Sequence, residues 1–107
     1  MDFINTIEIA GRIGSLNVQD ICGTKKATMS IRVDHVFTGR NGGLFCKTDW
    51  IPVSVWQRPG LPDLATLAKE KGIRVKGRLT STQYTRPDGT DASYLEVVAE
   101  EMSLPED

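Results

Sequence analysis

Hydrophobic and polar residues alternate one by one along five separate stretches of the chain. In "ATMSIRVD", residues 27–34, polar side chains stand between Ala27, Met29, Ile31 and Val33. A period of two puts the alternating residues on opposite faces of a β-strand. The same pattern recurs at 5–14, 48–56, 72–84 and 92–102. The chain is therefore predicted to form five strands, each with one apolar face.

Segments rich in turn-forming residues separate these strands. "SLNVQDICGTKK", residues 15–26, is expected to be a loop between the first and second strands. "TGRNGG", residues 38–43, predicts a hairpin tip between the second and third. "TRPDGTD", residues 85–91, supplies Pro, Asp and Gly for a turn between the fourth and fifth.

One segment breaks the β pattern and predicts a short helix. In "PDLATLAKEKG", residues 62–72, Asp63 can cap the N-terminus and Gly72 can end the helix. A short apolar stripe is formed by Leu64, Leu67 and Ala68. Five strands with one helix between the third and fourth is the arrangement of the OB-fold. We therefore expect one all-β domain over residues 1–107, a five-stranded Greek-key barrel with this helix.

Length and composition fit a single domain of ordinary character. A chain of 107 residues with 39% hydrophobic residues can bury a core of its own. The longest apolar runs have three residues, and the N-terminus lacks the pattern of a signal peptide. Cys22 and Cys46 have no CxxC spacing and no histidine nearby. Two reduced thiols in a cytoplasmic protein are the simplest interpretation, and a disulfide between them stays open.

The formal net charge of -1 hides an asymmetry along the chain. Residues 96–107 hold five acidic residues and neither Lys nor Arg. Residues 1–95 hold all 13 basic residues against nine acidic ones, which leaves this part at +4. A mildly basic body with an acidic end is compatible with nucleic-acid binding but does not require it.

The third predicted strand, "TDWIPVSVW", carries both tryptophans of the protein on one face. Trp50 and Trp56 lie on the same side as Pro52 and the small Ser54. The opposite side is an ordinary core face, formed by Ile51, Val53 and Val55. The two largest side chains are thus directed away from the expected core, with room between them.

Cations are expected on the outward faces of the neighbouring strands. Those of the fourth strand are Arg74, Lys76 and Arg78, followed by the aromatic Tyr84, and the second strand adds Arg32. Single-stranded nucleic acid is bound by this combination, because bases stack on aromatic rings while Lys and Arg follow the phosphates. Each ingredient also has a simpler explanation: paired tryptophans often fill a core or a subunit interface, and charged strands often face solvent.

Nothing in the sequence indicates catalysis, a metal site or a cofactor. His35 is the only histidine and has no partner at a recognisable spacing. Asp88 and Asp91 are typical turn residues, and "GRIG" is too short for a phosphate-binding loop. No nucleotide-binding, zinc or catalytic-triad motif is present. We expect a protein that is not an enzyme.

Several segments, in order and spacing, are similar to those of one family. They are "GRIG", "ATMSIRVD", "KTDW", "KGIRVKGRL" and "YTRPDGTDASYLEVVAEEM". Over nearly its whole length the chain resembles the bacterial-type single-stranded DNA-binding proteins. The resemblance implies that bases stack on four aromatic residues: Phe37, Trp50, Trp56 and Tyr84. Simple alternation would place Phe37 on the core side of its strand.

The resemblance also implies which cations contact the DNA backbone. The matching positions are Arg12, Lys47, Arg78 and Arg86. Together with the outward cations they make the predicted phosphate-binding set Arg12, Arg32, Lys47, Arg74, Lys76, Arg78 and Arg86.

Family members usually assemble as homotetramers, or as dimers of fused domains, and this chain departs from them in two places. Ile51-Pro52 replaces the common His-Arg after the tryptophan of the third strand, in a region used for subunit contacts. Pro52 lacks a backbone N–H, which suits a strand edge or a bulge. The chain ends at "SLPED" without the family's long linker and the acidic tip that recruits other replication proteins, so replication proteins stay open as partners. We expect either a trimmed domain or a short stand-alone member.

Our prediction is a protein that coats single-stranded DNA, without strong sequence preference, in replication, recombination or repair. A homotetramer is expected, and a dimer stays open. One competing hypothesis is a tail-less dimer resembling primosomal replication protein N. Another is an OB-fold interaction subunit whose tryptophans lie in a protein interface.

Overall fold

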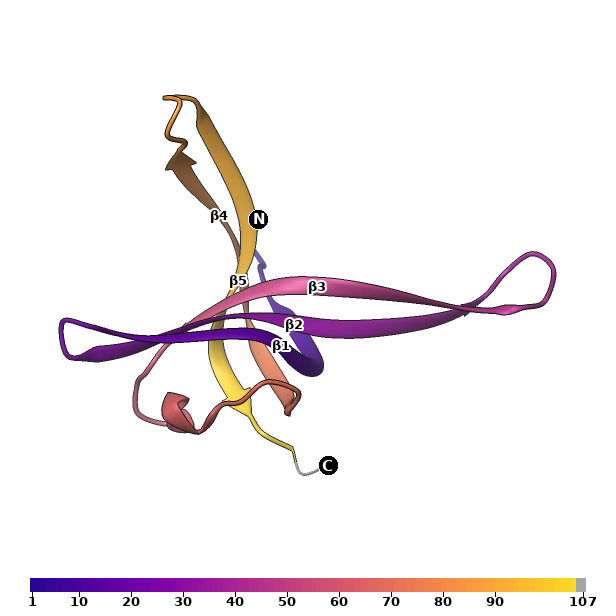
Figure 1. Cartoon of the computed structure of the whole chain (residues 1–107), viewed down its shortest axis with the longest axis horizontal. Coiled ribbons are helices and arrows are strands. Elements are labelled where there is room, and N and C mark those ends of the chain that lie inside the picture. Colours follow the sequence, from indigo (N-terminus) through magenta and orange to yellow (C-terminus); the bar gives the residue numbers. More distant parts are fainter. Residues whose placement is uncertain (106–107) are drawn as a thin grey trace.

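Five strands close into a barrel in which every strand has two neighbours (Figure 1). They are β1 (Ile7–Ile21), β2 (Thr24–Thr38), β3 (Leu44–Trp56), β4 (Gly72–Thr85) and β5 (Asp91–Ser103). The computed structural model describes residues 1–105, so residues 106 and 107 of the predicted domain lie outside it. Around the barrel the order is β1, β2, β3, β5, β4, and β4 pairs with β1. The predicted all-β OB-fold is confirmed.

The apolar faces of the alternating strands meet inside this barrel. The fully buried side chains include Ile13, Ile31, Val53, Val55, Ile73, Val75 and Val97, with Leu64 closing one end. Every one of these strand residues lies on the face that the period of two assigned to the core. Burying branched aliphatic side chains is the main term that stabilises such a barrel, at roughly 1.5–3 kcal/mol for each side chain.

Three hairpins extend beyond the barrel as arms. In Figure 1 the β1–β2 hairpin points to the left, the β2–β3 hairpin to the right and the β4–β5 hairpin upwards. β2 is 15 residues long and belongs to both horizontal arms. The β2–β3 hairpin tip was predicted, and residues 39–43 form it. The molecule therefore offers elongated ribbon surfaces as well as a barrel wall.

The expected loop at residues 15–26 is wrong, since β1 continues to Ile21 and β2 begins at Thr24. Cys22 and Gly23 form the two-residue turn, with φ values of 52° and 86°. Positive φ at both central residues is the geometry that matches the twist of a hairpin. The carboxylate of Asp20 also accepts a hydrogen bond from the Gly23 N–H at 3.0 Å. Pairing with β2 converts an apparently irregular segment into a regular arm.

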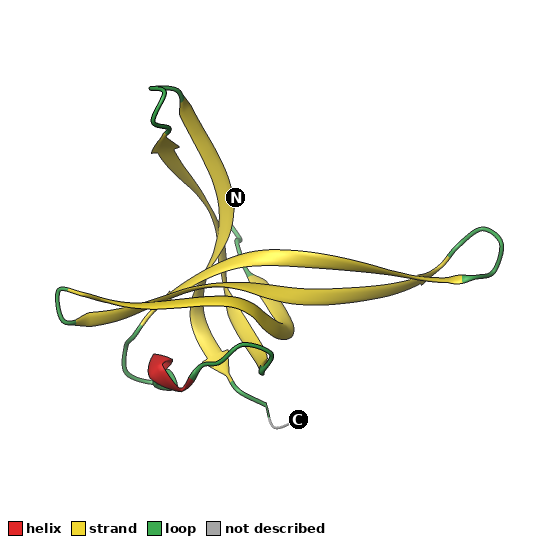
Figure 2. Cartoon of the chain, in the orientation of Figure 1, coloured by secondary structure: helices red, strands yellow, loops and turns green. Residues whose placement is uncertain are grey.

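The predicted helix at residues 62–72 is reduced to a single 3-10 turn, Leu64–Thr66 (Figure 2). Asp63 caps this turn as expected, because its carboxylate accepts the Ala65 N–H at 3.0 Å. Leu64 and Leu67 are buried, but the backbone is already extended at Leu67. Ala68 is exposed, and Gly72 begins β4 instead of ending a helix. Two leucines can close the barrel end without a full helix.

Two register shifts and the β4–β5 arm limit the simple alternation. The β1–β2 register shifts between Ile13 and Ser15, and the β4–β5 register shifts between Lys76 and Gly77. Leu79 and Leu95, assigned to the core side by alternation, are exposed. Both lie where β4 and β5 leave the barrel, so their inward face meets no opposing strand. Across residues 1–105, no helix is long and apolar enough to cross a membrane.

Candidate nucleic-acid interface

The outward direction of both tryptophans is confirmed. Trp50 is 58% exposed and Trp56 is 42% exposed, while Val53 and Val55 on the other face are fully buried. β3 pairs with β2 along its whole length, from Leu44 to Trp56. Continuous pairing keeps the strand regular, so both rings remain on the same outer face. A regular, continuously paired strand thus holds two large aromatic surfaces towards solvent.

The two residues between the rings behave differently from each other. Ser54 is only 5% exposed, because β3 pairs there with Thr28 of β2 and with Val98 of β5. Pro52 is exposed and lies opposite Ser30, with no register shift recorded in the β2–β3 pairing. The parallel pairing with β5 begins one residue later, at Val53. Pro52 therefore occupies a strand edge, the first of the two positions expected for it, and forms the surface between the rings.

Gly14 is a site residue that the sequence reasoning missed. A Cβ built at Gly14 would lie 2.3 Å from Cζ3 of Trp50 and 3.1 Å from the hydroxyl of Ser30. The Trp50 ring thus reaches across β2 and rests on the β1 backbone at the bulge. Glycine is required for this contact, since any side chain would displace the ring. A glycine at the end of a strand pattern was the available signal.

Lys26, which lies beside Trp56, is a second residue that the sequence reasoning missed. The two residues are cross-strand partners, and the Lys26 ammonium lies 5.2 Å from the centre of the Trp56 ring. This distance is typical of a cation–π interaction, worth about 0.5–1 kcal/mol at an exposed site. The contact orients the ring and puts a positive charge beside it.

Arg12, Arg32 and Trp50 form one row across β1, β2 and β3. The guanidinium of Arg32 lies 3.8 Å from the carboxylate of Asp34. The guanidinium of Arg12 donates a hydrogen bond to the carbonyl oxygen of Glu70 at 2.9 Å. The row places two of the predicted phosphate-binding cations next to one of the predicted stacking rings.

Phe37 lies on the face of the β2–β3 arm opposite to that of Trp50, as simple alternation indicated. It is exposed there because the arm extends beyond the barrel. Its ring centre is 5.9 Å from that of His35 and 5.7 Å from that of Phe45, and the planes are inclined by 17° and 23°. Lys47 lies opposite His35 and 3.6 Å from the carboxylate of Asp49. Phe45 and His35 extend the predicted single ring into a row of three, which the sequence reasoning missed.

Tyr84 projects from the β4–β5 arm and has an aromatic neighbour. Its ring centre lies 5.9 Å from that of Tyr94, with the planes inclined by 58°, and both rings are exposed. The two tyrosines lie on one face of the arm, at positions paired with Ala92 and Thr82. Tyr94 was not among the predicted residues. Arg86, at the tip of this arm, donates to the Thr90 hydroxyl at 3.5 Å.

The three cations of β4 differ in their surroundings. Arg74 forms an ion pair with Glu8, and Lys76 lies opposite Glu101 of β5 and Glu8 of β1. Arg78 lies opposite Val98, and within residues 1–105 it has neither a hydrogen bond nor an ion pair. Of the three, Arg78 alone has neither an ion pair nor an acidic residue at a paired position of a neighbouring strand.

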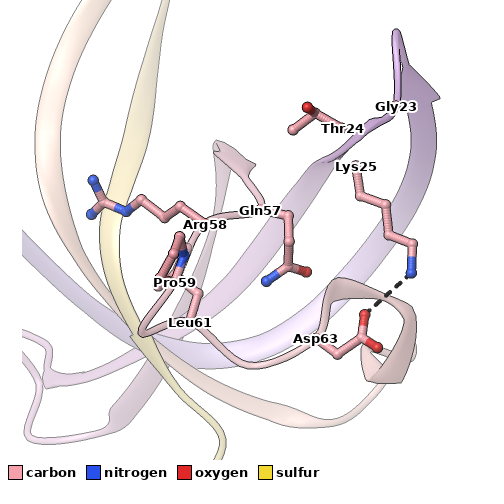
Figure 3. A pocket seen from close by; sticks show the side chains of 8 residues that line it. All are labelled: Gly23, Thr24, Lys25, Gln57, Arg58, Pro59, Leu61 and Asp63. Carbon is pink, nitrogen blue, oxygen red and sulfur yellow. Dashed lines mark hydrogen bonds and ion pairs between the residues drawn. The ribbon is translucent and has the colours of Figure 1, made fainter.

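A polar groove of about 640 Å³ lies beyond Trp56, between the β1–β2 hairpin and the segment that follows β3 (Figure 3). Lys25 crosses it to Asp63 at 3.4 Å. The Ala65 N–H and then Lys25 lower the pKa of the Asp63 carboxyl. Gln57 is held by the Pro62 carbonyl and the Leu64 N–H, at 3.1 and 2.7 Å. Within residues 1–105, no three His, Cys, Asp or Glu side chains are grouped as metal ligands.

Comparisons with known proteins place the chain in one family. The model of the single-strand binding protein family matches residues 4–105. The chain is 31% identical over 108 residues to the single-stranded DNA-binding protein of Clostridium tetani, covering 96% of this chain and 71% of that protein. It is 28% identical over 106 residues to single-stranded DNA-binding protein 3 of Clostridium acetobutylicum, covering 96% and 72%.

Solved structures show the same fold. A structure titled "Plasmodium falciparum SSB complex with ssDNA" superposes with a TM-score of 0.82 at 20% identity, covering 99% of this chain and 98% of that chain. A deletion mutant of the single-stranded DNA binding protein from Thermus aquaticus superposes with a TM-score of 0.77 at 19% identity, covering 96% and 51%.

Proposed function

This chain belongs to the single-strand binding protein family, and from that premise we propose that it binds single-stranded DNA on the outer face of β2 and β3. It holds the strand without catalysing a reaction on it, in replication, recombination or repair. The observation that carries the proposal is the exposure of Trp50 and Trp56 on one outer face of a continuously paired strand, each beside a cation.

Stacking supplies the main attraction in this proposal. Every base has a π-face, and stacking on an aromatic side chain is worth roughly 1–3 kcal/mol per base. Trp50 and Trp56 provide two such surfaces on the barrel wall. Tyr84, enlarged by Tyr94, extends the path onto the β4–β5 arm. Phe37, enlarged by Phe45, extends it onto the β2–β3 arm, where the DNA passes to the opposite face of the arm. Stacking alone does not read base edges, so strong sequence specificity is not expected from the rings.

The cations neutralise phosphates along the same path. We assign the nearest contacts to Arg32 and Lys26, which flank Trp50 and Trp56. Arg78 and Arg86 lie towards the β4–β5 arm, Lys47 lies beside the rings of the β2–β3 arm, and Arg12 completes the row of Trp50. Arg74 and Lys76 contribute less, because Glu8 and Glu101 lie beside them. Affinity is expected to fall with salt as counterions are released.

A titration with oligo-dT tests the proposal. At low salt, bound bases should quench the fluorescence of Trp50 and Trp56, and added salt should reverse the quenching. A matched titration with duplex DNA of the same length should give much weaker binding, because paired bases cannot stack on the rings. If saturating oligo-dT leaves the fluorescence unchanged, the proposal fails.

The assembly follows from the same premise. We propose a homo-oligomer, with the homotetramer of the sequence prediction as the expected form, acting on DNA in the cytoplasm. Exposed Val36 and Leu44 of the β2–β3 arm are apolar surface that a second copy or DNA would cover. Solution mass discriminates a tetramer from the competing dimer. If Trp56→Ala dissociates the oligomer and leaves DNA binding intact, the tryptophans belong to a protein interface instead.

A further inference from the structure

The outer face between Trp50 and Trp56 is hollowed by a groove of about 510 Å³. Its lining combines uncharged polar side chains with apolar ones: Ser15, Leu16, Asn17 and Gln19 of β1, Thr28, Met29 and Ser30 of β2, and Pro52 of β3. None of the described residues that line it is charged. The groove is therefore chemically unlike both of its ends, where cations lie beside the tryptophans.

The strand register places this groove between the two stacking rings. Asn17 pairs with Thr28, and Ser30 pairs with both Ser15 and Pro52. Trp50 is two residues before Pro52 on the same face of β3, and its ring leans across Ser30 towards Gly14. At the other end, Lys26 pairs with Gln19 on one side and with Trp56 on the other. The rings are six positions apart on β3, about 20 Å at 3.3 Å per residue.

A strand that stacks on both rings must carry nucleotides through this groove. Phosphates gain little here, because no cation lines the walls. They are attracted instead to Arg32 beside Trp50 and to Lys26 beside Trp56. The bases between the two stacking positions are consequently the parts of the strand that face the groove walls.

Three side chains of the groove have unused hydrogen-bonding capacity. Ser15 and Ser30 are occupied with each other, their hydroxyl oxygens being 2.8 Å apart. Across residues 1–105, the side chains of Asn17, Gln19 and Thr28 make no hydrogen bond. An amide offers a donor and an acceptor side by side, and a hydroxyl offers both. Base edges present the same pairs of groups, and amides can contact them in a bidentate manner.

We propose that this groove reads the edges of bases held between Trp50 and Trp56, and that Asn17, Gln19 and Thr28 give the protein a preference among bases. The inference rests on the proposed function, since it needs a strand lying across the two rings. It goes beyond that function, because stacking on tryptophan accepts every base. Affinity then comes from the rings and cations, and discrimination comes from the uncharged polar walls.

The test compares binding of dT, dC and dA oligonucleotides of equal length to the full chain at one low salt concentration. We expect at least about a fivefold difference between the strongest and weakest of the three. Asn17→Ala removes the amide, and Thr28→Val removes the hydroxyl while keeping the shape. Each substitution should reduce the ratio between the affinities for the strongest- and weakest-binding oligonucleotides by several-fold. The self-stacking of free dA is the same for every protein variant and cancels when variants are compared.

Two controls make the outcome decisive. Gln83→Ala removes an exposed amide on the β4–β5 arm, away from the groove, and should leave all ratios unchanged. An abasic oligonucleotide should bind equally to the wild-type protein and to Asn17→Ala. Unchanged ratios in both groove variants, with tryptophan quenching intact, would overturn this inference alone. Absence of quenching by every oligonucleotide would instead overturn the proposed function.

Discussion

The outer face of β2–β3 and the outer face of β4 both carry cations, but their neighbours differ. On β2–β3, Arg32 lies beside Trp50 and Lys26 lies over Trp56. On the part of β4 that pairs with β1, Arg74 is ion-paired to Glu8 and Lys76 lies opposite Glu101. On the first face the cations lie beside aromatic rings, although Arg32 also lies 3.8 Å from the carboxylate of Asp34. On the second face the neighbours of the cations are carboxylates.

Because of this difference, a count of basic residues does not by itself distinguish the proposed DNA-binding face from the rest of the barrel. The formal charge of +4 over residues 1–95 is spread over both faces. Exposed ion pairs such as Arg74 with Glu8 contribute little to stability, but a neighbouring carboxylate still weakens the attraction for a phosphate. Aromatic rings next to the cations, more than charge alone, distinguish the β2–β3 face from the β4 face.

Removing either tryptophan ring should have the largest effect on DNA binding and is the strongest test of the difference between the two faces. Trp50→Ala and Trp56→Ala should each weaken oligo-dT binding by roughly 5- to 150-fold, the equivalent of about 1–3 kcal/mol of stacking. Binding measured by anisotropy of a labelled oligonucleotide avoids dependence on the lost fluorescence. Phe3→Ala, which removes an exposed aromatic ring from the segment before β1, is the matched control. Equal effects of all three variants would refute a special role for the β2–β3 face.

A substitution at Gly14 should have the next largest effect, because its side chain would displace the Trp50 ring. Gly14→Ala is expected to weaken oligo-dT binding by several-fold although it removes no atom. A double-mutant cycle with Trp50→Ala checks the mechanism. In the Trp50→Ala background, Gly14→Ala should cause little further loss. Additive losses would show that Gly14 acts through something other than the ring.

The cations of β4 sharpen the comparison through their salt dependence. Arg78 has no carboxylate partner within residues 1–105, whereas Arg74 is paired with Glu8. Arg78→Ala should therefore reduce the slope of log affinity against log salt by about 0.7, the value for one contact with a single-stranded phosphate. Arg74→Ala should change the slope less. The reverse order would move the binding path onto the β1–β4 side of the barrel.

The smallest expected effect concerns Asp63. Its carboxylate forms an ion pair with Lys25 in the groove between the β1–β2 hairpin and the segment that follows β3. The Ala65 N–H and Lys25 lower its pKa below the usual 3.8. A lowered pKa stabilises the folded state above pH 3.8, and this contribution is lost as the pH falls through the folded-state pKa. Between pH 6 and pH 2, the melting temperature of Asp63→Asn should fall slightly less than that of the wild-type protein. An identical fall in both proteins would show that ionised Asp63 does not contribute to the stability of the folded state.

The alternating pattern was a reliable guide wherever a strand formed the barrel wall. Ile31, Val53 and Val75 are fully buried as their positions indicated, and Trp50 and Trp56 face outwards. The pattern failed at Leu79 and Leu95, where the same strands leave the barrel and no second layer covers them. Alternation describes two faces of a strand, but the surroundings decide whether either face is buried.

The site was only partly predictable for a related reason. Trp50, Trp56 and Tyr84 could be selected from their strand positions, whereas Gly14 and Lys26 matter through partners on other strands. Phe45 and Tyr94 likewise gain their significance from Phe37 and Tyr84, which lie across a hairpin. Such pairings depend on register, and a register shift such as that after Ile13 changes which residues share a row.

By itself, the sequence determined the five strands, the core face of each and the outward direction of the two tryptophans, because a period of two is a local property of the chain. The tertiary structure decided the rest. It turned the loop at 15–26 into an arm, placed Gly14 under Trp50, paired Arg74 with Glu8 and formed the uncharged groove between the rings. The arm depends on the pairing of β1 with β2 across a two-residue turn. The other three depend on contacts between residues far apart in sequence, which only the closed barrel brings together.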